Sequence, residues 1–511
     1  MIKISSNKRI AKNTLMLYFR MLLSMIVSLY TSRVVLNALG IDDFGIYNVV
    51  GGIVIMLGFL NNAMAASTQR FLTFEIGKND VIQLKKIFNM SVTIHIIIAL
   101  IVLLISETLG VWFLNNKMNI PVSRLIAANW VYQFSVFSFI ITVLSVPYNA
   151  AIIAHERMKA FALVGLIEVF LKLIIAVIIV FYSFDKLILY SFLLFLISLI
   201  IRIIYGVYCN RQFEESKNYN FNWDQDLFKS MGNFAGWNLL GVSAAIGYNQ
   251  GVNILLNIFF GPTVNAARGI AFQVQGAVNS FVANFQVAVN PTITKLYAQG
   301  ETEKSYKLVF SSSKFSFFLL LLLSMPLLIE TNTVLSWWLK VVPEYAVIFT
   351  RLVLIDILIG SISGSIQSLV QATGKIKNYQ LFVSGVLLLN LPISYLFLKF
   401  GYAPEYTLMI SVFFSFCALF VRLIIIKKLF DFPINDFIYS VLGRIMVVSM
   451  VSSACVMFTN IYIPDSNWKF LLLGITSFII ISVLIYIIGL NAYEKSILKT
   501  NYRNIINKLT L

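Results

Sequence analysis

The sequence contains little charge. Only 12% of its 511 residues are Asp, Glu, Lys or Arg, whereas 59% are hydrophobic and the mean hydropathy is +0.85. A soluble domain carries about 25% charged residues, so the composition excludes an ordinary soluble enzyme or binding protein. Apolar runs long enough to cross a bilayer recur along the chain. These features predict an all-α polytopic membrane protein.

Cysteine and histidine are also scarce. Cys209, Cys417 and Cys455 are scattered in or beside apolar runs, and His95 and His155 are equally isolated. None of these spacings is typical of a disulfide framework or a metal site. We therefore expect no metal and no bound cofactor, with H⁺ or Na⁺ as candidate coupling ions. No catalytic motif is present either, so the sequence does not indicate an enzyme.

Fourteen apolar stretches, each of about 20 residues or more, predict fourteen transmembrane helices. The pair 230–260 and 263–290 has the weakest hydropathy, because both are rich in Gly, Asn and Gln. The predicted spans are 13–36, 44–68, 87–114, 122–149, 159–182, 186–209, 230–260, 263–290, 308–330, 345–372, 379–399, 405–428, 437–460 and 467–489.

Basic residues are distributed unevenly between the connections. With the N-terminus placed in the cytoplasm, the inner connections hold 27 of the 39 Lys and Arg, and the outer connections hold six. This positive-inside bias predicts that both termini are cytoplasmic. It also accounts for the net charge of +17 without nucleic acid as a partner.

The two halves of the chain resemble each other. The segment VVLNALGIDDFGIYNVVGGIV, from Val34, aligns with NILLNIFFGPTVNAARGIAFQ, from Asn253, and two later pairs of segments keep a similar offset. A repeat of six spans predicts two six-helix bundles related by a pseudo-two-fold axis along the membrane normal, with a substrate site between them. The expected parts are a bundle over 1–209, a cytoplasmic linker over 210–229, a second bundle over 230–428, and two additional helices with a basic tail over 429–511.

Polar side chains follow one line along the span 263–290. Their spacings of 7, 4 and 7 residues keep them on one helical face. The members of this line are Arg268, Gln275, Asn279 and Gln286. Asn249 and Asn253 share a face of the preceding span. Because polar groups at bilayer depth need water or polar partners, we expect both sets to line a substrate cavity. Hydrogen bonding between helices is the alternative.

Charged residues also occur inside other spans. Arg20 and Arg33 lie in the first span, where a central charge costs about 2.5 to 3.5 kcal/mol on insertion scales; they either line the cavity or extend toward the headgroups. Glu168 and Lys172 have the spacing of a neutralising pair. That pair, or Asp356, is the candidate ion-coupling site, since intramembrane carboxylates often serve in proton relays.

Cations within the spans outnumber acids, which favours an anionic substrate. The planar fork of arginine fits phosphate especially well. The cations are Arg20, Arg33, Lys172, Arg268, Arg351 and Arg444, and the acids are Glu168 and Asp356.

The stretch SRVVLNALGIDDFGIYNVVGGIVIMLGFLNNAMAASTQRFLTFEIGK, residues 32–78, resembles the N-terminal region of bacterial O-antigen flippases. These belong to the multidrug/oligosaccharidyl-lipid/polysaccharide (MOP) exporter superfamily. The resemblance implies alternating access in a V-shaped pair of bundles in the bacterial cytoplasmic membrane. The implied substrate is an undecaprenyl-diphosphate-linked oligosaccharide for surface polysaccharide, with other polysaccharide-assembly proteins as expected partners. In related lipid II flippases, arginines of the first, second and eighth spans line a cationic cavity; Arg20 or Arg33 and Arg268 occupy similar helices, whereas Arg70 lies beyond the predicted second span.

Other functions remain open. The first is a multidrug or small-molecule exporter of the MATE type within the same superfamily. The second is a membrane enzyme of polysaccharide assembly, a polymerase or a glycosyltransferase. The third is a membrane scaffold, which the polar line along span 263–290 argues against. Short outer connections and the basic excess in the spans favour the flippase over the exporter and the enzyme.

Overall fold

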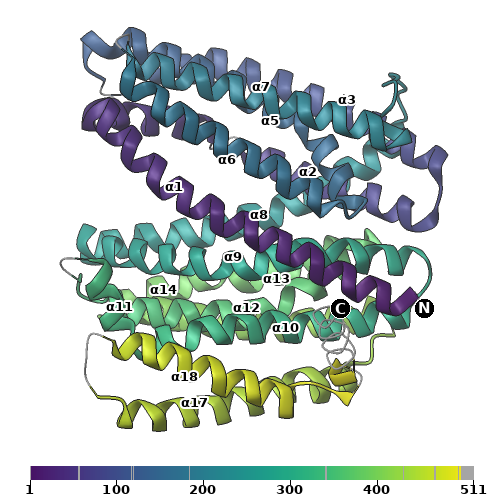
Figure 1. Cartoon of the computed structure of the whole chain (residues 1–511), viewed down its shortest axis with the longest axis vertical. Coiled ribbons are helices and arrows are strands. Elements are labelled where there is room, and N and C mark those ends of the chain that lie inside the picture. The colour runs from purple at the N-terminus through teal and green to yellow at the C-terminus, as the bar shows by residue number, and fades with distance from the viewer. Residues whose placement is uncertain are drawn as a thin grey trace, which may run out of the picture. The chain divides into compact units, whose positions relative to one another are not determined.

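The computed structural model describes residues 2–496, except 56–57, 117, 119, 183–184, 340–341, 430, 465–467 and 493. The regular secondary structure of this described part is helical throughout (Figure 1). In a bilayer a helix satisfies its backbone hydrogen bonds within its own segment. The all-α prediction is therefore confirmed.

The chain divides into two compact units. The N-terminal unit comprises Ile10–Val242 and Thr294–Gly300, and the C-terminal unit comprises Met1–Arg9, Ser243–Ile293 and Glu301–Leu511. Helices α1 (Ile2–Ile55), α8 (Gln225–Phe260) and α9 (Pro262–Ala298) contribute residues to both units. The expected domain limits remain a prediction.

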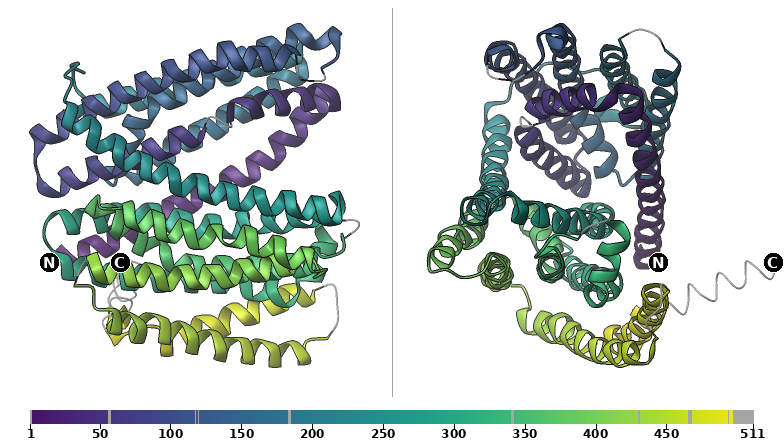
Figure 2. Two further views of the ribbon diagram at one scale, coloured as in Figure 1. Left: turned by 180° about the vertical axis from the view of Figure 1, so that it is seen from behind. Right: turned by 90° about the vertical axis from the view of Figure 1, so that its left-hand side faces the viewer.

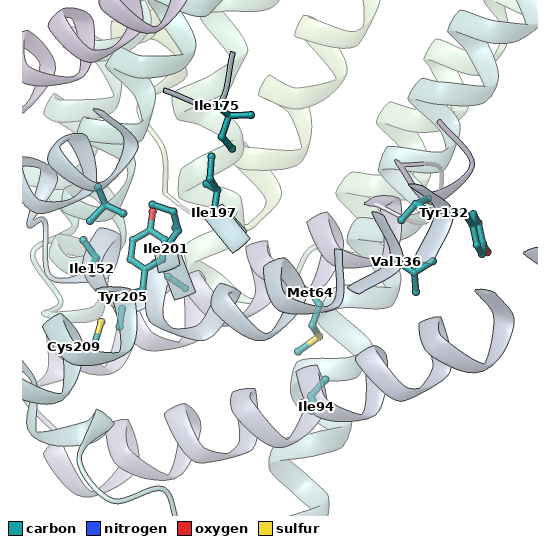
Figure 3. Packing of buried hydrophobic residues seen from close by; sticks show 14 of the residues in the cluster. Met64, Ile94, Tyr132, Val136, Ile152, Ile175, Ile197, Ile201, Tyr205 and Cys209 are labelled. Atoms are coloured by element: carbon teal, nitrogen blue, oxygen red, sulfur yellow. The ribbon is translucent and has the colours of Figure 1, made fainter. Parts of the chain in front are cut away.

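The N-terminal unit is built around α5 (Leu125–Ala154), which packs against α2, α3 and α7. Figure 3 shows part of its apolar cluster, including Tyr132 and Val136 on α5 and Ile197, Ile201 and Tyr205 on α7. The other main helices of this unit are α1 (Ile2–Ile55), α2 (Gly58–Lys78), α3 (Val81–Ile105), α4 (Val111–Asn116), α6 (Met158–Phe181) and α7 (Lys186–Gln212).

Gly40 divides α1 into two helical segments. Its φ of 81° and ψ of 169° are not helical, and this region of φ is accessible mainly to glycine. The break falls between the predicted spans 13–36 and 44–68. Described residues of span 44–68 are helical on both sides of 56–57.

Arg124 connects the ends of three helical segments in the N-terminal unit. It donates hydrogen bonds to Asp43 and Asp185, each with a shortest distance of 2.6 Å. Burial acts to raise the pKa of Asp185, but hydrogen bonds from Arg124 and from the N–H groups of Ile188 and Leu187 outweigh it and hold this pKa below its ordinary value.

Gly77 marks a close approach of α2 to the end of α9. A Cβ at this position would lie 2.7 Å from Ala298 Cβ and 3.0 Å from the Lys295 backbone. We expect Gly77→Ala to destabilise the protein by about 1 to 3 kcal/mol, because the neighbouring backbone cannot move without strain. Gly58→Ala, on the same helix, is the control, because a Cβ at Gly58 meets only Phe139 at 4.0 Å. Thermal unfolding in nanodiscs measures both, and equal midpoints would contradict the prediction.

The C-terminal unit is built around α10 and α12. Helix α10 packs against α12, α17 and α18, while α12 also packs against α15. Figure 2 shows α17 and α18, in yellow-green and yellow, running alongside each other. The helices are α10 (Thr302–Ile329), α11 (Thr331–Trp338), α12 (Ala346–Thr373), α13 (Lys377–Leu388), α14 (Asn390–Lys399), α15 (Tyr406–Leu429), α16 (Ile434–Phe437), α17 (Arg444–Tyr462) and α18 (Lys469–Leu484).

A buried ion pair attaches the segment after α18 to α10. Lys314 Nζ lies 2.7 Å from Glu494 Oε2, and Ser311 donates to the other carboxylate oxygen at 3.0 Å. Since both charged side chains are buried, loss of one partner would leave the other charge uncompensated. The two C-terminal helices are thus fixed to the rest of their unit.

Twelve helices of the described residues are long and apolar enough to cross a membrane. They include Gln225–Phe260, which has the lowest hydropathy of the set. The predicted spans 44–68 and 263–290 do not belong to this set, although described residues of both are helical. The high content of Asn and Gln lowers the hydropathy of 263–290, whereas the predicted span 44–68 includes 56–57, which lie outside the described residues. The expected count of fourteen and the pseudo-two-fold relation are therefore not confirmed.

Candidate functional site

The N-terminal unit contains a cavity of about 690 Å³ whose lining is polar and apolar in similar measure. It lies among α1, α2, α5, α6 and α7. Tyr205, Ile197 and Ile201, which Figure 3 labels, form part of its α7 wall. Other polar lining residues are Tyr47, Asn61, Gln69, Asn149 and Tyr190. The volume lies in the range of small-molecule sites.

Glu168 and Lys172 line this same cavity. Lys172 Nζ lies 2.6 Å from Glu168 Oε1, so the predicted i,i+4 pair is formed. Arg20 of α1 packs against α6, the helix that carries this pair. Its guanidinium carbon lies 4.4 Å from the centre of the Phe161 ring, and a Cβ at Gly165 would come within 2.8 Å of its Cδ. The structure thus brings Arg20 close to the pair. Arg33, farther along α1, has an exposed side chain.

The C-terminal unit contains a smaller polar cavity of about 100 Å³. Asn249 of α8, Gln275 of α9 and Asp356 of α12 line it together. Tyr248 and Ser411, also in the lining, are joined by a hydrogen bond between their hydroxyl groups. The structure therefore brings together three residues with separate predicted roles. Asn249 and Gln275 were predicted to line the substrate cavity, and Asp356 was predicted to bind the coupling ion.

Asp356 accepts a hydrogen bond from Ser415 of α15 at 2.5 Å. That contact uses one carboxylate oxygen and orients the group against the neighbouring helix. A carboxylate lining a polar cavity within a membrane span is suited to binding a proton or a cation.

Arg268 lies at the edge of this smaller cavity and contacts two of its lining residues. Its Nη2 donates to the backbone oxygen of Asn249 at 3.1 Å, and its guanidinium carbon lies 4.1 Å from the centre of the Phe272 ring. The residue is only 7% exposed. Among the described residues, no carboxylate forms an ion pair with it, and its Nε has no hydrogen-bond acceptor. Arg268 is therefore a buried cation with an unused donor.

The remaining members of the polar line have different surroundings. Asn253 accepts two hydrogen bonds from Asn265 Nδ2, at 2.7 Å to its backbone oxygen and 2.8 Å to Oδ1. The amide of Gln286 packs against Gly364 of α12, where no Cβ would fit. Asn279 is exposed. Of the four residues on α9, Gln275 is the one that lines the cavity of the C-terminal unit.

Sequence reasoning missed several residues of this site. Tyr248 precedes Asn249, so its position beside a polar residue in a span was an available signal. Ser411 and Ser415 lie in an ordinary apolar run, and nothing in the local pattern distinguishes them. Their importance comes from the packing of α15 on α12.

Solved structures with similar folds are MATE transporters. A MATE structure in complex with MaD3S has a TM-score of 0.71 and 12% identity over 83% of this chain and 96% of that chain. An outward-facing multidrug resistance MATE transporter of the MOP superfamily has a TM-score of 0.68 and 13% identity over 82% of this chain and 95% of that chain. The chain thus has the fold of these MATE transporters.

A third similar structure is a MOP superfamily transporter from Pyrococcus furiosus. Its TM-score is 0.65, with 13% identity over 83% of this chain and 96% of that chain. It is described as having a binding pocket of reverse polarity that suggests a different function. No family model matches the present sequence, and no curated protein matches it.

Proposed function

We propose that the protein is a transporter that flips undecaprenyl-diphosphate-linked oligosaccharides across the bacterial cytoplasmic membrane for surface-polysaccharide synthesis. The observation that carries this proposal is Arg268, a buried cation without an ion-pair partner among the described residues. A buried charge is costly unless it is compensated. A diphosphate supplies both the missing negative charge and an acceptor for Nε–H.

The charge balance of the spans supports an anionic substrate. Lys172 neutralises Glu168 within the pair at 2.6 Å, which leaves the other span cations in excess. Sugars attached to the diphosphate need hydrogen-bonding groups while they cross the membrane, and Asn249, Gln275 and Tyr248 supply them. The lipid chain would remain in the bilayer, and both termini would lie in the cytoplasm.

A second candidate function is export of a small molecule, as in the MATE alternative. The 690 Å³ cavity of the N-terminal unit favours it, because its volume and its tyrosine-rich lining suit a compact organic ligand. The two functions differ in substrate charge and in the lipid anchor, so a direct transport measurement distinguishes them.

The test is a flipping assay with the purified protein in liposomes. A fluorescent disaccharide on a polyprenyl diphosphate is placed in both leaflets, and a membrane-impermeant glycosidase removes the sugar from accessible molecules. With the protein present, nearly all of the substrate should become accessible; in protein-free liposomes about half should remain protected. Protection equal to that in protein-free liposomes, together with efflux of a cationic dye from the same liposomes, would favour the small-molecule exporter instead.

A further inference from the structure

A third cavity, of about 550 Å³, lies in the N-terminal unit between the first turns of α3 and the segment 218–224. We call it the α3-loop cavity. Its lining residues are Val81, Ile82, Lys85, Lys86 and Asn89 of α3, together with Asn218, Tyr219, Asn220, Asn222 and Asp224. Residues 81–86 and 218–224 belong to connections that the charge distribution predicts to be cytoplasmic, and Asn89 lies at the start of the predicted span 87–114. The cavity shares no lining residue with the other two.

The sequence of the segment, NYNFNWD, alternates amides with aromatic rings. The residues at 218, 220, 222 and 224 all line the cavity. Phe221 and Trp223 are absent from the lining, and both are exposed. Asn220, Asn222 and Asp224 thus supply amide and carboxylate groups to the cavity, and Tyr219 also lines it. Each amide offers both donors and acceptors, the combination that sugar hydroxyls require.

Two hydrogen bonds fix the segment 218–224. The Tyr219 hydroxyl and Thr93 Oγ1 lie 3.0 Å apart, which joins the segment to α3. Asp224 Oδ1 accepts from the Leu227 N–H at 3.0 Å and so caps the start of α8. The Asp224 charge is thereby directed toward the positive end of a helix rather than left free in the cavity.

Asn89 provides an independent indication of a ligand. It lines the cavity, yet it is only 7% exposed, and its Oδ1 has no hydrogen-bond partner among the described residues. A buried amide oxygen without a partner is unfavourable. A ligand hydroxyl would satisfy it once the amide turns toward the cavity, because this oxygen is itself buried in the structure.

Lys85 and Lys86 provide the positive charge of the cavity. Both are exposed, and within the described residues neither has a carboxylate in ion-pair contact; Glu214, which lies nearby, pairs with Lys217 at 2.5 Å instead. Two ammonium groups beside a row of amides fit a ligand that carries both phosphate and hydroxyl groups.

We infer that the α3-loop cavity binds the phosphorylated sugar headgroup of a glycan donor, separately from the transport cavities. If the proposed function holds, this headgroup belongs to the lipid-linked substrate, which would be recognised before it enters the transporter. A soluble sugar diphosphate offers the same chemistry from the aqueous side. Lys85 and Lys86 contact the phosphates, and Asn89, Asn220 and Asn222 contact the sugars.

Calorimetric titration of the full chain in nanodiscs tests this site with four probes. They are a disaccharide 1-diphosphate, the same disaccharide without phosphate, inorganic pyrophosphate, and the disaccharide diphosphate on a short polyprenyl chain. The disaccharide diphosphate should bind about tenfold or more tightly than either the free disaccharide or pyrophosphate. Tighter binding of the polyprenyl probe indicates the lipid-linked source, and equal binding indicates the soluble one.

Variants then show which residues bind the phosphates of the ligand and which bind its sugars. The double variant Lys85→Ala/Lys86→Ala should weaken binding of the disaccharide diphosphate about tenfold and leave the neutral disaccharide unaffected. The double variant Asn220→Ala/Asn222→Ala should bind the disaccharide diphosphate no more tightly than it binds pyrophosphate. Lys78→Ala is the matched control, because Lys78 belongs to the same connection as Lys85 and Lys86 but does not line the cavity; the affinity of this variant should stay within about twofold of the wild type.

The inference is overturned if the disaccharide diphosphate binds no tighter than pyrophosphate, or if the asparagine variant retains the wild-type preference. These outcomes are separable from failure of the proposed function. Flipping by a wild-type protein that does not bind the soluble headgroup contradicts this site alone. Headgroup binding that depends on these residues, in a protein that flips no lipid-linked sugar, contradicts the proposed function alone.

Discussion

Replacing Arg268 with alanine is expected to slow flipping of the diphosphate-linked substrate by about a hundredfold or more, because hydrogen bonds to a charged group contribute roughly 1.5 to 3 kcal/mol each and the guanidinium can form two of them. The contact with the Asn249 backbone oxygen and the packing over Phe272 orient the fork. Arg268→Lys keeps the charge but loses the fork, so it should recover only part of the rate. The measurement is the initial rate of loss of glycosidase protection in liposomes.

Arg351→Ala is the matched control for loss of an arginine from the same unit. Arg351 donates to Thr331 Oγ1 and to the backbone oxygen of Ile329, both at 3.2 Å, and it does not line the cavity of Asn249 and Gln275. Its alanine variant should therefore flip substrate at close to the wild-type rate when equal amounts of folded protein are reconstituted. Wild-type flipping by a folded Arg268→Ala variant would show that this residue does not bind the diphosphate.

Replacing Asp356 with asparagine is expected to abolish the dependence of transport on an ion gradient. The amide preserves the size of the side chain and its hydrogen bond from Ser415, but it can neither take up a proton nor carry a negative charge. A gradient of one pH unit corresponds to about 1.4 kcal/mol per proton, or roughly tenfold in rate at most. The wild type should show a stimulation of this order with the coupling ion, H⁺ or Na⁺, and Asp356→Asn should show none. Rates with and without each gradient are measured in the same liposomes.

Glu168→Gln is the companion to this experiment. Because Lys172 already compensates Glu168 at 2.6 Å, we expect the glutamine variant to keep most of its gradient dependence. If transport by Glu168→Gln no longer depends on the ion gradient while transport by Asp356→Asn still does, the coupling site lies in the cavity of the N-terminal unit. Unchanged dependence in both variants would make both carboxylates structural.

Composition and local pattern were enough to predict a polytopic membrane protein and much of its secondary structure. Low charge and long apolar runs require helices, because the bilayer interior offers no other partner for the backbone. Local spacing was also enough to predict the Glu168–Lys172 ion pair, because its members lie one helical turn apart. The connection predicted between the spans 13–36 and 44–68 contains Gly40, where a non-helical conformation interrupts α1.

Which polar groups meet depends on the packing of helices that are distant in the sequence. Asp356 and its partner Ser415 lie on α12 and α15, 59 residues apart, and Asn89 faces a segment more than a hundred positions along the chain. The polar residues of α9 share one helical face, yet their surroundings differ. Arg268 contacts α8, Gln275 lines a cavity and Gln286 packs on α12. Hydropathy cannot distinguish these outcomes, because apolar helices present nearly equivalent surfaces to one another. Close packing of particular small and large side chains selects the neighbours of each helix.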